Sequence, residues 1–301
     1  MTVTVAISTR DRPEALGRCL AELMRGNVVP DEIVVVDQSR DGRTRETVEA
    51  ARRSGAPVVY RSEPRGGLGV AQNAGFELAG SDLVAVTDDD CVPAPDWLGV
   101  VVDVLTSEDA PDALTGRVLP YGDELPGTYA VASRTSAAQR DFVGKQPPWD
   151  VGSGNNFALS KAWFGRIGGC DERLGPGAPG QGALDMDLFY RLLRAGARIR
   201  YEPEALVYHE RTTRAGRLSR RYPYGFGMGA ATVFWLRRGD RYALRVLVRW
   251  IAMRASLLGR SLARGRLGSL HEELLVLRGT VGGLLHGIRA TRGGRNGTDE
   301  R

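Results

Sequence analysis

Leu83-Val84-Ala85-Val86-Thr87-Asp88-Asp89-Asp90 is the stretch of sequence that decides the fold. Its four apolar residues predict a short buried strand, and three carboxylates follow where that strand ends. Like charges this close repel one another, so the triplet is stable mainly where water or a cation neutralises it. Carboxylate oxygens suit Mg²⁺ or Mn²⁺, and such an ion would hold a diphosphate. A solvated turn is the alternative, but the position at a strand end favours a site.

Short apolar runs of the same kind precede this stretch and alternate with helical segments. Strands are predicted at residues 3–8, 33–36 and 58–60, and helices from residue 13, at 44–54 and at 70–78. This alternation is typical of a parallel sheet with right-handed crossovers. The predicted fold class is therefore α/β, with a Rossmann-like, mostly parallel sheet and flanking helices. In such sheets, ligands bind at the carboxyl ends of the strands.

The pattern is less regular from about residue 109 onward. Residues 116–119 and 156–159 are strand candidates, 185–195 is a predicted helix, and 199–207 is predicted to be extended.

Polar residues follow two other predicted strands. Thr9 and Arg10 follow the first, within Ser8-Thr9-Arg10-Asp11-Arg12, and Asp37 follows the second. The carboxyl ends of parallel strands meet at one edge, so these groups should join the aspartate triplet. There Asp37 could accept a hydrogen bond from a nucleobase or a ribose. Helix capping at Thr9 and an Asx turn at Asp37 are the alternatives.

A glycine-rich run at residues 65–75 invites comparison with the dinucleotide-binding fingerprint. The spacing fails, because Gln72 stands where the last glycine is required. A glycine-rich turn into a helix can still let the backbone approach a nucleotide closely.

The composition excludes several classes of protein. The 301 residues are 42% hydrophobic and 26% charged, which excludes collagenous and disordered chains. Three widely spaced cysteines offer neither a disulfide framework nor a CxxC metal site. The chain starts without the basic region of a signal peptide, and arginines interrupt its most apolar stretch, residues 244–262. Neither a signal peptide nor a membrane span is predicted, and a cytoplasmic location fits.

The net charge of +5 hides an asymmetry between two parts of the chain. From residue 237 to the end there are 14 arginines and 5 acids, whereas residues 1–236 carry a net charge of −4. Apolar residues at helical spacing predict amphipathic helices at 244–258 and 270–288. These helices either pack on the rest of the protein or a second subunit, or make a peripheral contact with the inner face of the cell membrane. Nucleic acid is not expected as a partner, since aromatic residues are not interleaved with the arginines.

Taken together, the motifs resemble a family 2 inverting glycosyltransferase with the A-type nucleotide-sugar fold. The matching motifs occur in order over about three-quarters of the chain: Ser8-Thr9-Arg10, Val34-Val35-Val36-Asp37, Arg65-Gly66-Gly67, Asp88-Asp89-Asp90, Gly154-Asn155-Asn156, Asp185-Met186-Asp187, and Tyr201-Glu202-Pro203 with His209. One such motif would be weak, but the ordered series is specific.

The resemblance implies a nucleotide-sugar site. Its predicted members are Thr9, Arg10, Asp37, Arg65, Asp88 and Asp89. Asp37 matches the acid that contacts the base, and Arg65 lies where the family contacts the nucleotide or diphosphate. Asp89 is placed to reach the ribose.

The resemblance also implies a Mg²⁺ or Mn²⁺ cofactor. Asp88 and Asp90 match the ends of the metal-binding Asp-x-Asp motif, with Asp90 as the direct ligand. His209 falls where some members place a late metal or diphosphate contact. A lone histidine after a strand is more often structural, so both interpretations of His209 stay open.

The acceptor side contains one departure from the family pattern. Asp185 matches the catalytic base, but Leu184 occupies the position where the family often has a glutamate. Asp187 is a second candidate for that region. Asn155 and Asn156 are predicted to hydrogen-bond sugar hydroxyls of the acceptor, with a turn as the alternative. Helix capping by Asp185 is the alternative, and it is compatible with catalysis.

The predicted domain organisation follows from these motifs and from the charge asymmetry. Residues 1–220 form a catalytic domain, with a nucleotide half at about 1–108 and an acceptor half at about 109–220. Residues 221–291 form a basic amphipathic helical appendage, and residues 292–301 a disordered tail.

The predicted function is metal-dependent, inverting transfer of one sugar from a nucleoside-diphosphate-sugar, with UDP as the default, to a hydroxyl. The acceptor is a glycan, a lipid-linked glycan or a small molecule. This chemistry needs a cation to stabilise the departing diphosphate and one carboxylate to take the hydroxyl proton. A nucleotidyltransferase, or a degenerate nucleotide-sugar-binding or membrane scaffold protein, is the alternative.

Overall fold

The computed structural model of the protein describes residues 2–131 and 134–290. The chain forms two compact units. The first, the sheet unit, runs to Asp171 and resumes over Asp185–Thr213; the second, the helical unit, contains Glu172–Leu184 and the chain from Arg214 on. The predicted disordered tail, residues 292–301, lies outside the described residues.

The first half of the sheet unit is a parallel sheet with the strand order β3-β2-β1-β4. These strands are β1 (Val3–Thr9), β2 (Glu32–Asp37), β3 (Val58–Ser62) and β4 (Leu83–Asp88). In the register of the sheet, Thr9 lies beside Asp37 and Ser8 lies beside Asp88. The predicted site residues of these three strands therefore meet at one edge.

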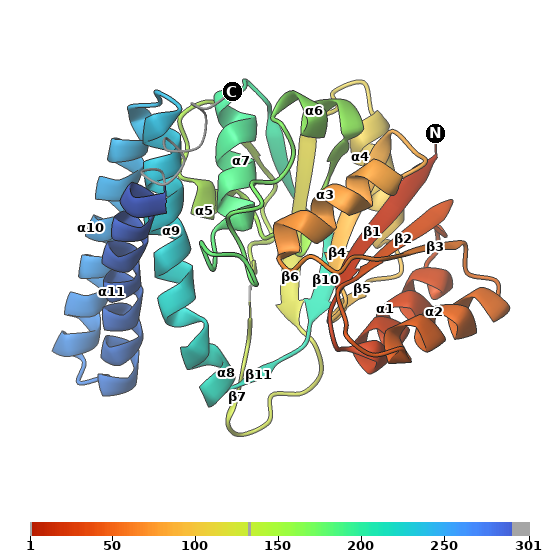
Figure 1. Ribbon diagram of the computed structural model, residues 1–301, viewed down its shortest axis with the longest axis horizontal. Coiled ribbons are helices and arrows are strands. Elements are labelled where there is room, and N and C mark those ends of the chain that lie inside the picture. Colours follow the sequence, from red (N-terminus) through yellow and green to blue (C-terminus); the bar gives the residue numbers. More distant parts are fainter. Residues whose placement is uncertain (1, 132–133, 291–301) are drawn as a thin grey trace, which may run out of the picture. The chain divides into compact units, whose positions relative to one another are not determined.

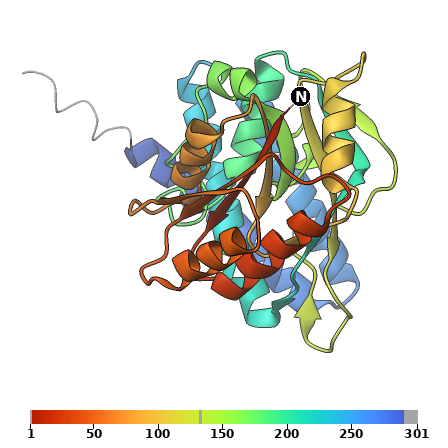
Figure 2. The same ribbon diagram turned by 90° about the vertical axis from the view of Figure 1, so that its right-hand side faces the viewer.

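Helices cover both faces of the sheet, as Figures 1 and 2 show. They are α1 (Pro13–Arg25), α2 (Arg43–Arg53), α3 (Leu68–Leu78) and α4 (Trp97–Thr106). Because side chains alternate along a strand, Val5 and Val35 pack in one core with Leu16 of α1, whereas Val34 packs against Ala71 of α3 on the other face. Burial on both faces explains why these strands are apolar throughout.

The second half of the sheet is mixed. Its strands are β5 (Cys91–Pro93), β6 (Ala113–Pro120), β8 (Arg140–Phe142), β9 (Asn156–Ser160) and β10 (Ile199–His209). Strand β9 lies between β4 and β6 and is antiparallel to both, β10 is parallel to β6, and β5 and β8 are antiparallel to β10. Strands β6 and β10 consequently point the same way as β4. The carboxyl end of β10, at His209, thus faces the same edge as the aspartate triplet.

Shorter elements complete the sheet unit. They are α5 (Pro148–Val151), α6 (Lys161–Arg166), α7 (Leu184–Arg194), whose first residue belongs to the helical unit, and the two-stranded sheet of β7 (Thr128–Tyr129) and β11 (Thr212–Thr213).

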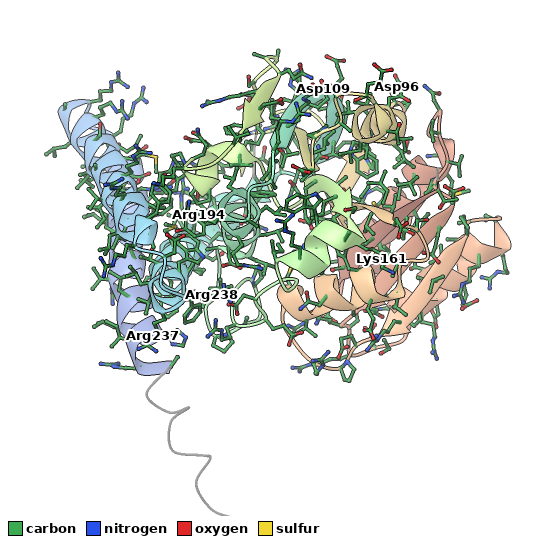
Figure 3. The ribbon with its side chains drawn as sticks, turned by 90° about the horizontal axis from the view of Figure 1, so that it is seen from above. Asp96, Asp109, Lys161, Arg194, Arg237 and Arg238 are labelled. Carbon is green, nitrogen blue, oxygen red and sulfur yellow. The ribbon has the colours of Figure 1, made fainter. Side chains whose placement is uncertain are left out.

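The helical unit is built from α8 (Arg214–Ser219), α9 (Arg221–Arg237), α10 (Tyr242–Ala263) and α11 (Leu267–Ala290). Helix α9 packs against α10 and α11, and Figure 3 labels Arg237 and Arg238 at its carboxyl end. The sequence predicts α10 and α11, but it misses α9. That helix contains Pro223 and three glycines and is apolar on all sides, so it lacks the helical period. Among the described residues, no helix is long and apolar enough to cross a membrane.

Glycines allow α9 and α11 to approach each other closely. A methyl group at Gly225 or Gly229 of α9 would collide with a carbonyl oxygen of α11, at Val276 or Thr280. In the same way, a methyl group at Gly283 of α11 would collide with the carbonyl oxygen of Phe226. The glycines that weaken the helical pattern in the sequence are therefore the residues that the packing requires.

Candidate active site

The aspartate triplet at the end of β4 is bound by two residues of the first strand and helix. The Thr9 hydroxyl donates a hydrogen bond to Asp89 Oδ2 at 2.7 Å, and Arg12 Nη1 donates to Asp89 Oδ1 at 3.1 Å and to Asp90 Oδ2 at 2.7 Å. Arg10, a predicted site residue from this segment, lies 3.7 Å from Asp11, and half of its side chain is exposed. Arg12 ends the same segment but is not among the predicted site residues, and it is the arginine that contacts the triplet.

The pKa values of the triplet reflect its crowding. Burial raises the pKa of Asp88 well above its usual range, and the charges of Asp90 and Asp89 raise it further. Burial also raises the pKa of Asp89, and Arg12 opposes this shift. A divalent cation at this edge would relieve the repulsion, so the electrostatics fit the predicted metal site.

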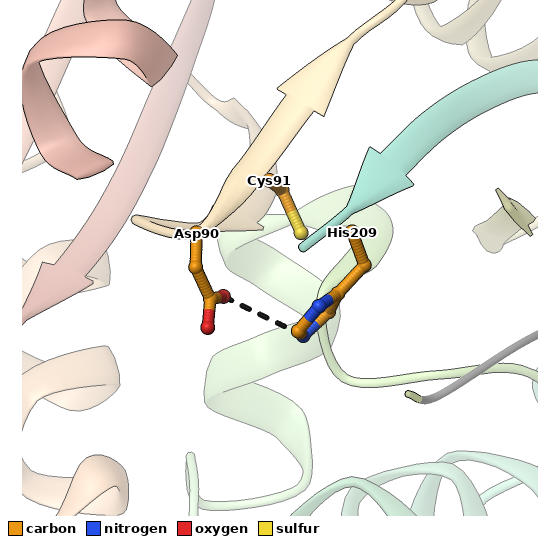
Figure 4. A group of neighbouring side chains, drawn as sticks. All are labelled: Asp90, Cys91 and His209. Carbon is orange, nitrogen blue, oxygen red and sulfur yellow. Dashed lines mark ion pairs between the residues drawn. The ribbon is translucent and has the colours of Figure 1, made fainter. Parts of the chain in front are cut away.

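His209 lies next to Asp90, with 3.5 Å between His209 Nε2 and Asp90 Oδ1 (Figure 4). His209 Nδ1 lies 2.8 Å from the carbonyl oxygen of Glu210, which can only accept a hydrogen bond. Nδ1 can therefore donate to that oxygen, which leaves Nε2 as the ring nitrogen that faces Asp90. A carboxylate oxygen and an imidazole nitrogen in this arrangement fit Mn²⁺ or Mg²⁺.

Cys91 is a third member of this cluster and is not among the site residues predicted from the sequence. It pairs directly with His209 across β5 and β10, so both side chains lie on one face of the sheet. One donor atom from each of Asp90, Cys91 and His209 lies within 4.8 Å of the others. Burial raises the pKa of the Cys91 thiol, which favours the neutral form.

Asp37 is held rigidly at the end of β2. Its Oδ1 accepts a hydrogen bond from the Ser39 N–H, and its Oδ2 accepts one from the Tyr60 hydroxyl, both at 2.8 Å. Burial raises the pKa of Tyr60 to about 12, with the Asp37 carboxylate adding to the shift. Tyr60 is thus a protonated donor that orients the carboxylate. Apart from its place in a predicted strand, nothing in the sequence indicates this role.

Arg65 is fixed by a neighbouring carboxylate. Its Nε and Nη2 donate to the two oxygens of Glu63 at 3.0 and 3.2 Å, and these hydrogen bonds lower the pKa of Glu63. Gln38 Nε2 donates to the carbonyl oxygen of Gly67 at 3.1 Å, which ties the loop to the end of β2. The loop that carries Arg65 therefore lies next to the end of β2, and the contact of Arg65 with the nucleotide or diphosphate stays a prediction.

Asp185 lies in the first turn of α7. Its Oδ2 accepts a hydrogen bond from the Gly154 N–H at 3.2 Å, and its Oδ1 accepts one from the Met186 N–H at 2.9 Å. Burial raises the pKa of Asp185, and these backbone donors and the charge of Arg134 oppose the shift. Its own charge contributes to the raised pKa of Asp88, so the two carboxylates lie within electrostatic range. The structure thus brings the predicted base toward the triplet.

The three residues predicted to bind the acceptor are buried. Asn156 donates to the carbonyl oxygens of Arg117 and Ala205 and accepts from Trp97 Nε1, at 2.8 to 2.9 Å. Asp187 is fully buried and accepts from Arg191 Nε at 2.8 Å.

Asn155, 2% exposed, donates to Cys91 Sγ at 3.5 Å, and its Oδ1 has no hydrogen-bond partner in the described part of the chain. The contacts observed for these three residues are internal, and an acceptor contact by any of them stays a prediction.

Residues 4–168 match the family model described as glycosyl transferase family 2. The chain belongs to this family. The resemblance found in the sequence is therefore confirmed, and with it the assignment of the aspartate-bearing sheet to a family 2 fold.

The family assignment agrees with curated relatives. The chain is 29% identical over 288 residues to the pre-mycofactocin glycosyltransferase of Mycobacterium tuberculosis, with 92% of this chain and 56% of that protein covered. It is 24% identical over 230 residues to the glucosyl-dolichyl phosphate glucuronosyltransferase of Haloferax volcanii, with 70% and 69% covered. The chain thus spans a little over half the length of the mycobacterial relative.

Solved structures confirm the predicted α/β fold of this family 2 chain. The mannosyltransferase PcManGT from Pyrobaculum calidifontis, in complex with GDP-Man and Mn²⁺, has a TM-score of 0.63 at 18% identity and covers 94% of this chain and 86% of its own. Residues 1–349 of S. aureus TarS, in complex with UDP-GlcNAc, have a TM-score of 0.55 at 16% identity and cover 98% and 92%.

Proposed function

We propose that the protein is an inverting glycosyltransferase that moves one sugar from a nucleoside-diphosphate-sugar to an acceptor hydroxyl. The observation that carries this proposal is the shared carboxyl edge of β1, β2, β4 and β10 in a family 2 chain. That edge holds Asp37, the aspartate triplet and His209. Nucleotide-binding and metal-binding groups can therefore act on one donor molecule.

The nucleotide half of the donor would lie against Asp37 and Arg65. The Asp37 carboxylate, held by Tyr60 and Ser39, is a fixed acceptor for a base N–H or a ribose hydroxyl. Arg65 supplies a positive charge beside it for the nucleotide or diphosphate. UDP is the default nucleotide.

Asp90 and His209 would hold the divalent cation, with Asp88 close enough to add charge. When bound, Mn²⁺ or Mg²⁺ stabilises the negative charge that develops on the departing diphosphate. The structural neighbour PcManGT is in complex with GDP-Man and Mn²⁺, which supports testing Mn²⁺ first.

Asp185 is the residue we propose as the general base. Its carboxylate would take the proton of the acceptor hydroxyl as the oxygen attacks the anomeric carbon and the bond to the diphosphate breaks. A single direct displacement of this kind inverts the configuration. The raised pKa of Asp185 brings it closer to neutral pH, which strengthens it as a base.

The acceptor is proposed to be a hydroxyl on a glycan, a lipid-linked glycan or a small molecule. The names of the two relatives above describe glycosyl transfer, one of them to a dolichyl phosphate-linked sugar. Residues 1–220 would carry the reaction, and residues 221–291 would form an appendage with a separate role, which includes contact with the membrane surface.

The experiment that tests this function is calorimetric titration of the protein with UDP, GDP and dTDP, each with and without Mn²⁺. Mn²⁺-dependent binding of one nucleotide is the expected result. Asp90→Asn should abolish the metal dependence, because it removes the carboxylate beside His209, whereas Asp82→Asn, at an exposed position of the same unit, should not.

Binding of a nucleotide without metal dependence would contradict the proposed role of Asp90 and His209. Pyrophosphate release from a nucleoside triphosphate would favour the nucleotidyltransferase alternative. Nucleotide-sugar binding without transfer to any acceptor would favour the scaffold alternative.

A further inference from the structure

Helix α10 has two apolar faces, and only one of them packs inside the helical unit. The packed face contains the buried residues Tyr242, Val246 and Trp250, and Trp250 Nε1 donates to Thr280 of α11 at 3.0 Å. The other face is exposed. Its large apolar side chains are Leu244, Val248, Ile251 and Leu262, which are 52%, 65%, 42% and 67% exposed.

These four exposed residues form one stripe. At about 100° of rotation per residue, they fall within a sector roughly 60° wide, and the stripe is about 27 Å long. Arg245, Arg249 and Arg260 are also exposed and follow along one side of it. The exposed face of α10 therefore carries an apolar stripe beside a basic stripe.

The charge of α10 itself has a single sign, and Asp240 just before the helix accepts a hydrogen bond from the Tyr242 N–H. Residues 241–266 contain seven arginines and no aspartate or glutamate. The nearest acids along the chain after α10 are Glu272 and Glu273, and both are occupied: Glu272 accepts from Arg217 and Arg221, and Glu273 from the buried Arg254. Across the described ranges, Arg245, Arg249 and Arg260 have no ion-pair partner.

The two stripes meet in a shallow hollow of about 310 Å³ lined by Leu244, Arg245, Val248 and Arg249. An anionic phosphate group placed there would contact guanidinium groups on one side and apolar side chains on the other. A lipid headgroup at the surface of a bilayer has this combination of charge and neighbouring hydrocarbon.

We propose that the exposed face of α10 binds the surface of a bilayer that contains anionic lipid, with the apolar stripe inserted among the headgroups. A second copy of the chain fits less well, because a two-fold contact would bring the same arginines against one another. A polyanion such as nucleic acid would leave the apolar stripe unburied. The proposal does not depend on the chemistry at the sheet edge.

The test is flotation of the full-length protein with vesicles of phosphatidylcholine alone and of phosphatidylcholine with about a quarter phosphatidylglycerol. We expect binding to the anionic vesicles that weakens as salt is raised. Leu244→Ser/Val248→Ser and Arg245→Glu/Arg249→Glu should each reduce the bound-to-free ratio by about tenfold or more, since both stripes contribute.

The matched control is Arg278→Glu/Arg289→Glu, which makes the same charge change at exposed positions of α11. It should bind nearly as well as the unmodified protein. Equal loss in both arginine variants would indicate diffuse attraction and overturn the assignment to α10, as would the absence of binding to anionic vesicles.

A dimer that forms without lipid and is lost in Leu244→Ser/Val248→Ser would also overturn the proposal, in favour of a second copy. Unchanged thermal melting and unchanged Mn²⁺-dependent nucleotide binding in the variants would show that the fold is intact. Because nucleotide and vesicle binding are measured separately, either proposal can fail without the other.

Discussion

The sheet unit and the helical unit treat charge in opposite ways. In the sheet unit, three carboxylates gather at one strand end, and Arg12 donates hydrogen bonds to two of them. In the helical unit, arginines are in excess, and Glu272 accepts hydrogen bonds from both Arg217 and Arg221. Arg12 and Glu272 are thus each hydrogen-bonded to two residues of the opposite charge.

The two units differ in how the charged side chains that are in excess are distributed. The acids are gathered and partly buried, and the pKa of Asp88 is raised as a result. Arg245, Arg249 and Arg260 of α10 are instead spread along an exposed face. Carboxylates that lie close together can bind one small cation, whereas arginines distributed along a helix can bind an extended anionic surface. We therefore expect that a substitution can disable one unit and leave the other intact.

The largest effect is expected at Asp185. Asp185→Asn keeps the side chain's size but removes the proton acceptor, so transfer should fall by about 10³-fold. Nucleotide binding and vesicle binding should both remain. The measurement is the initial rate of sugar transfer, with Asp82→Asn as the matched control; full turnover in Asp185→Asn would rule out this residue as the base.

A packing change should disable the helical unit alone. Gly283→Ala places a methyl group against the carbonyl oxygen of Phe226 and should cost about 3 kcal/mol or more. Denaturant unfolding monitored by tryptophan fluorescence would measure the loss. Mn²⁺-dependent nucleotide binding by the sheet unit should persist.

The control for this prediction is Gly259→Ala, at an exposed helical position where an added methyl group has no neighbour within 4 Å. It should stabilise α10 by up to about 1 kcal/mol. Equal destabilisation by both substitutions would contradict the glycine-mediated contact between α9 and α11.

Arg12 should compete with the metal for the triplet. Arg12→Gln removes the positive charge from Asp89 and Asp90, so Mn²⁺ measured by electron paramagnetic resonance without nucleotide should bind about fivefold more tightly. The gain is modest because almost half of the Arg12 side chain is exposed. Arg12→Lys keeps the charge and should resemble the unmodified protein; weaker Mn²⁺ binding in Arg12→Gln would refute the competition.

The smallest effect is a shift in pH dependence. A base must be unprotonated, so kcat/KM should rise with pH through the pKa of Asp185, which burial holds above the ordinary aspartate value. Arg134 lowers that pKa, and Arg134→Gln should therefore move the acid limb to higher pH. Arg134→Lys should move it less, and an unchanged or lower acid limb in Arg134→Gln would contradict the assignment.

Local patterns in the sequence predicted most of the sheet unit. The apolar runs that end in Thr9, Asp37 and Asp88 are the strands β1, β2 and β4, because strands buried on both faces must be apolar throughout. The direction of β9 could not be predicted, since strand direction depends on pairing with β4 and β6 rather than on the residues of β9 itself.

In the candidate site, too, local sequence patterns predicted some residues, whereas others depend on contacts distant in the sequence. Carboxylates were found because acids at the end of an apolar strand stand out in a sequence. Arg12, Tyr60 and Cys91 were missed because their relevance comes from partners far away in the chain, Asp90, Asp37 and His209. The acceptor prediction for Asn156 shows the converse, since its polar side chain is occupied by internal hydrogen bonds.

The sequence by itself determined the family, the order of strands and helices over most of the chain, and the excess of arginine after residue 236. These properties depend on residue type and spacing, which can be read along the chain. Tertiary structure alone decided which arginine reaches the aspartate triplet, that His209 faces Asp90, and that α10 keeps an apolar face exposed. These facts depend on burial and on contacts between residues distant in the sequence, because only the folded chain determines which side chains become neighbours.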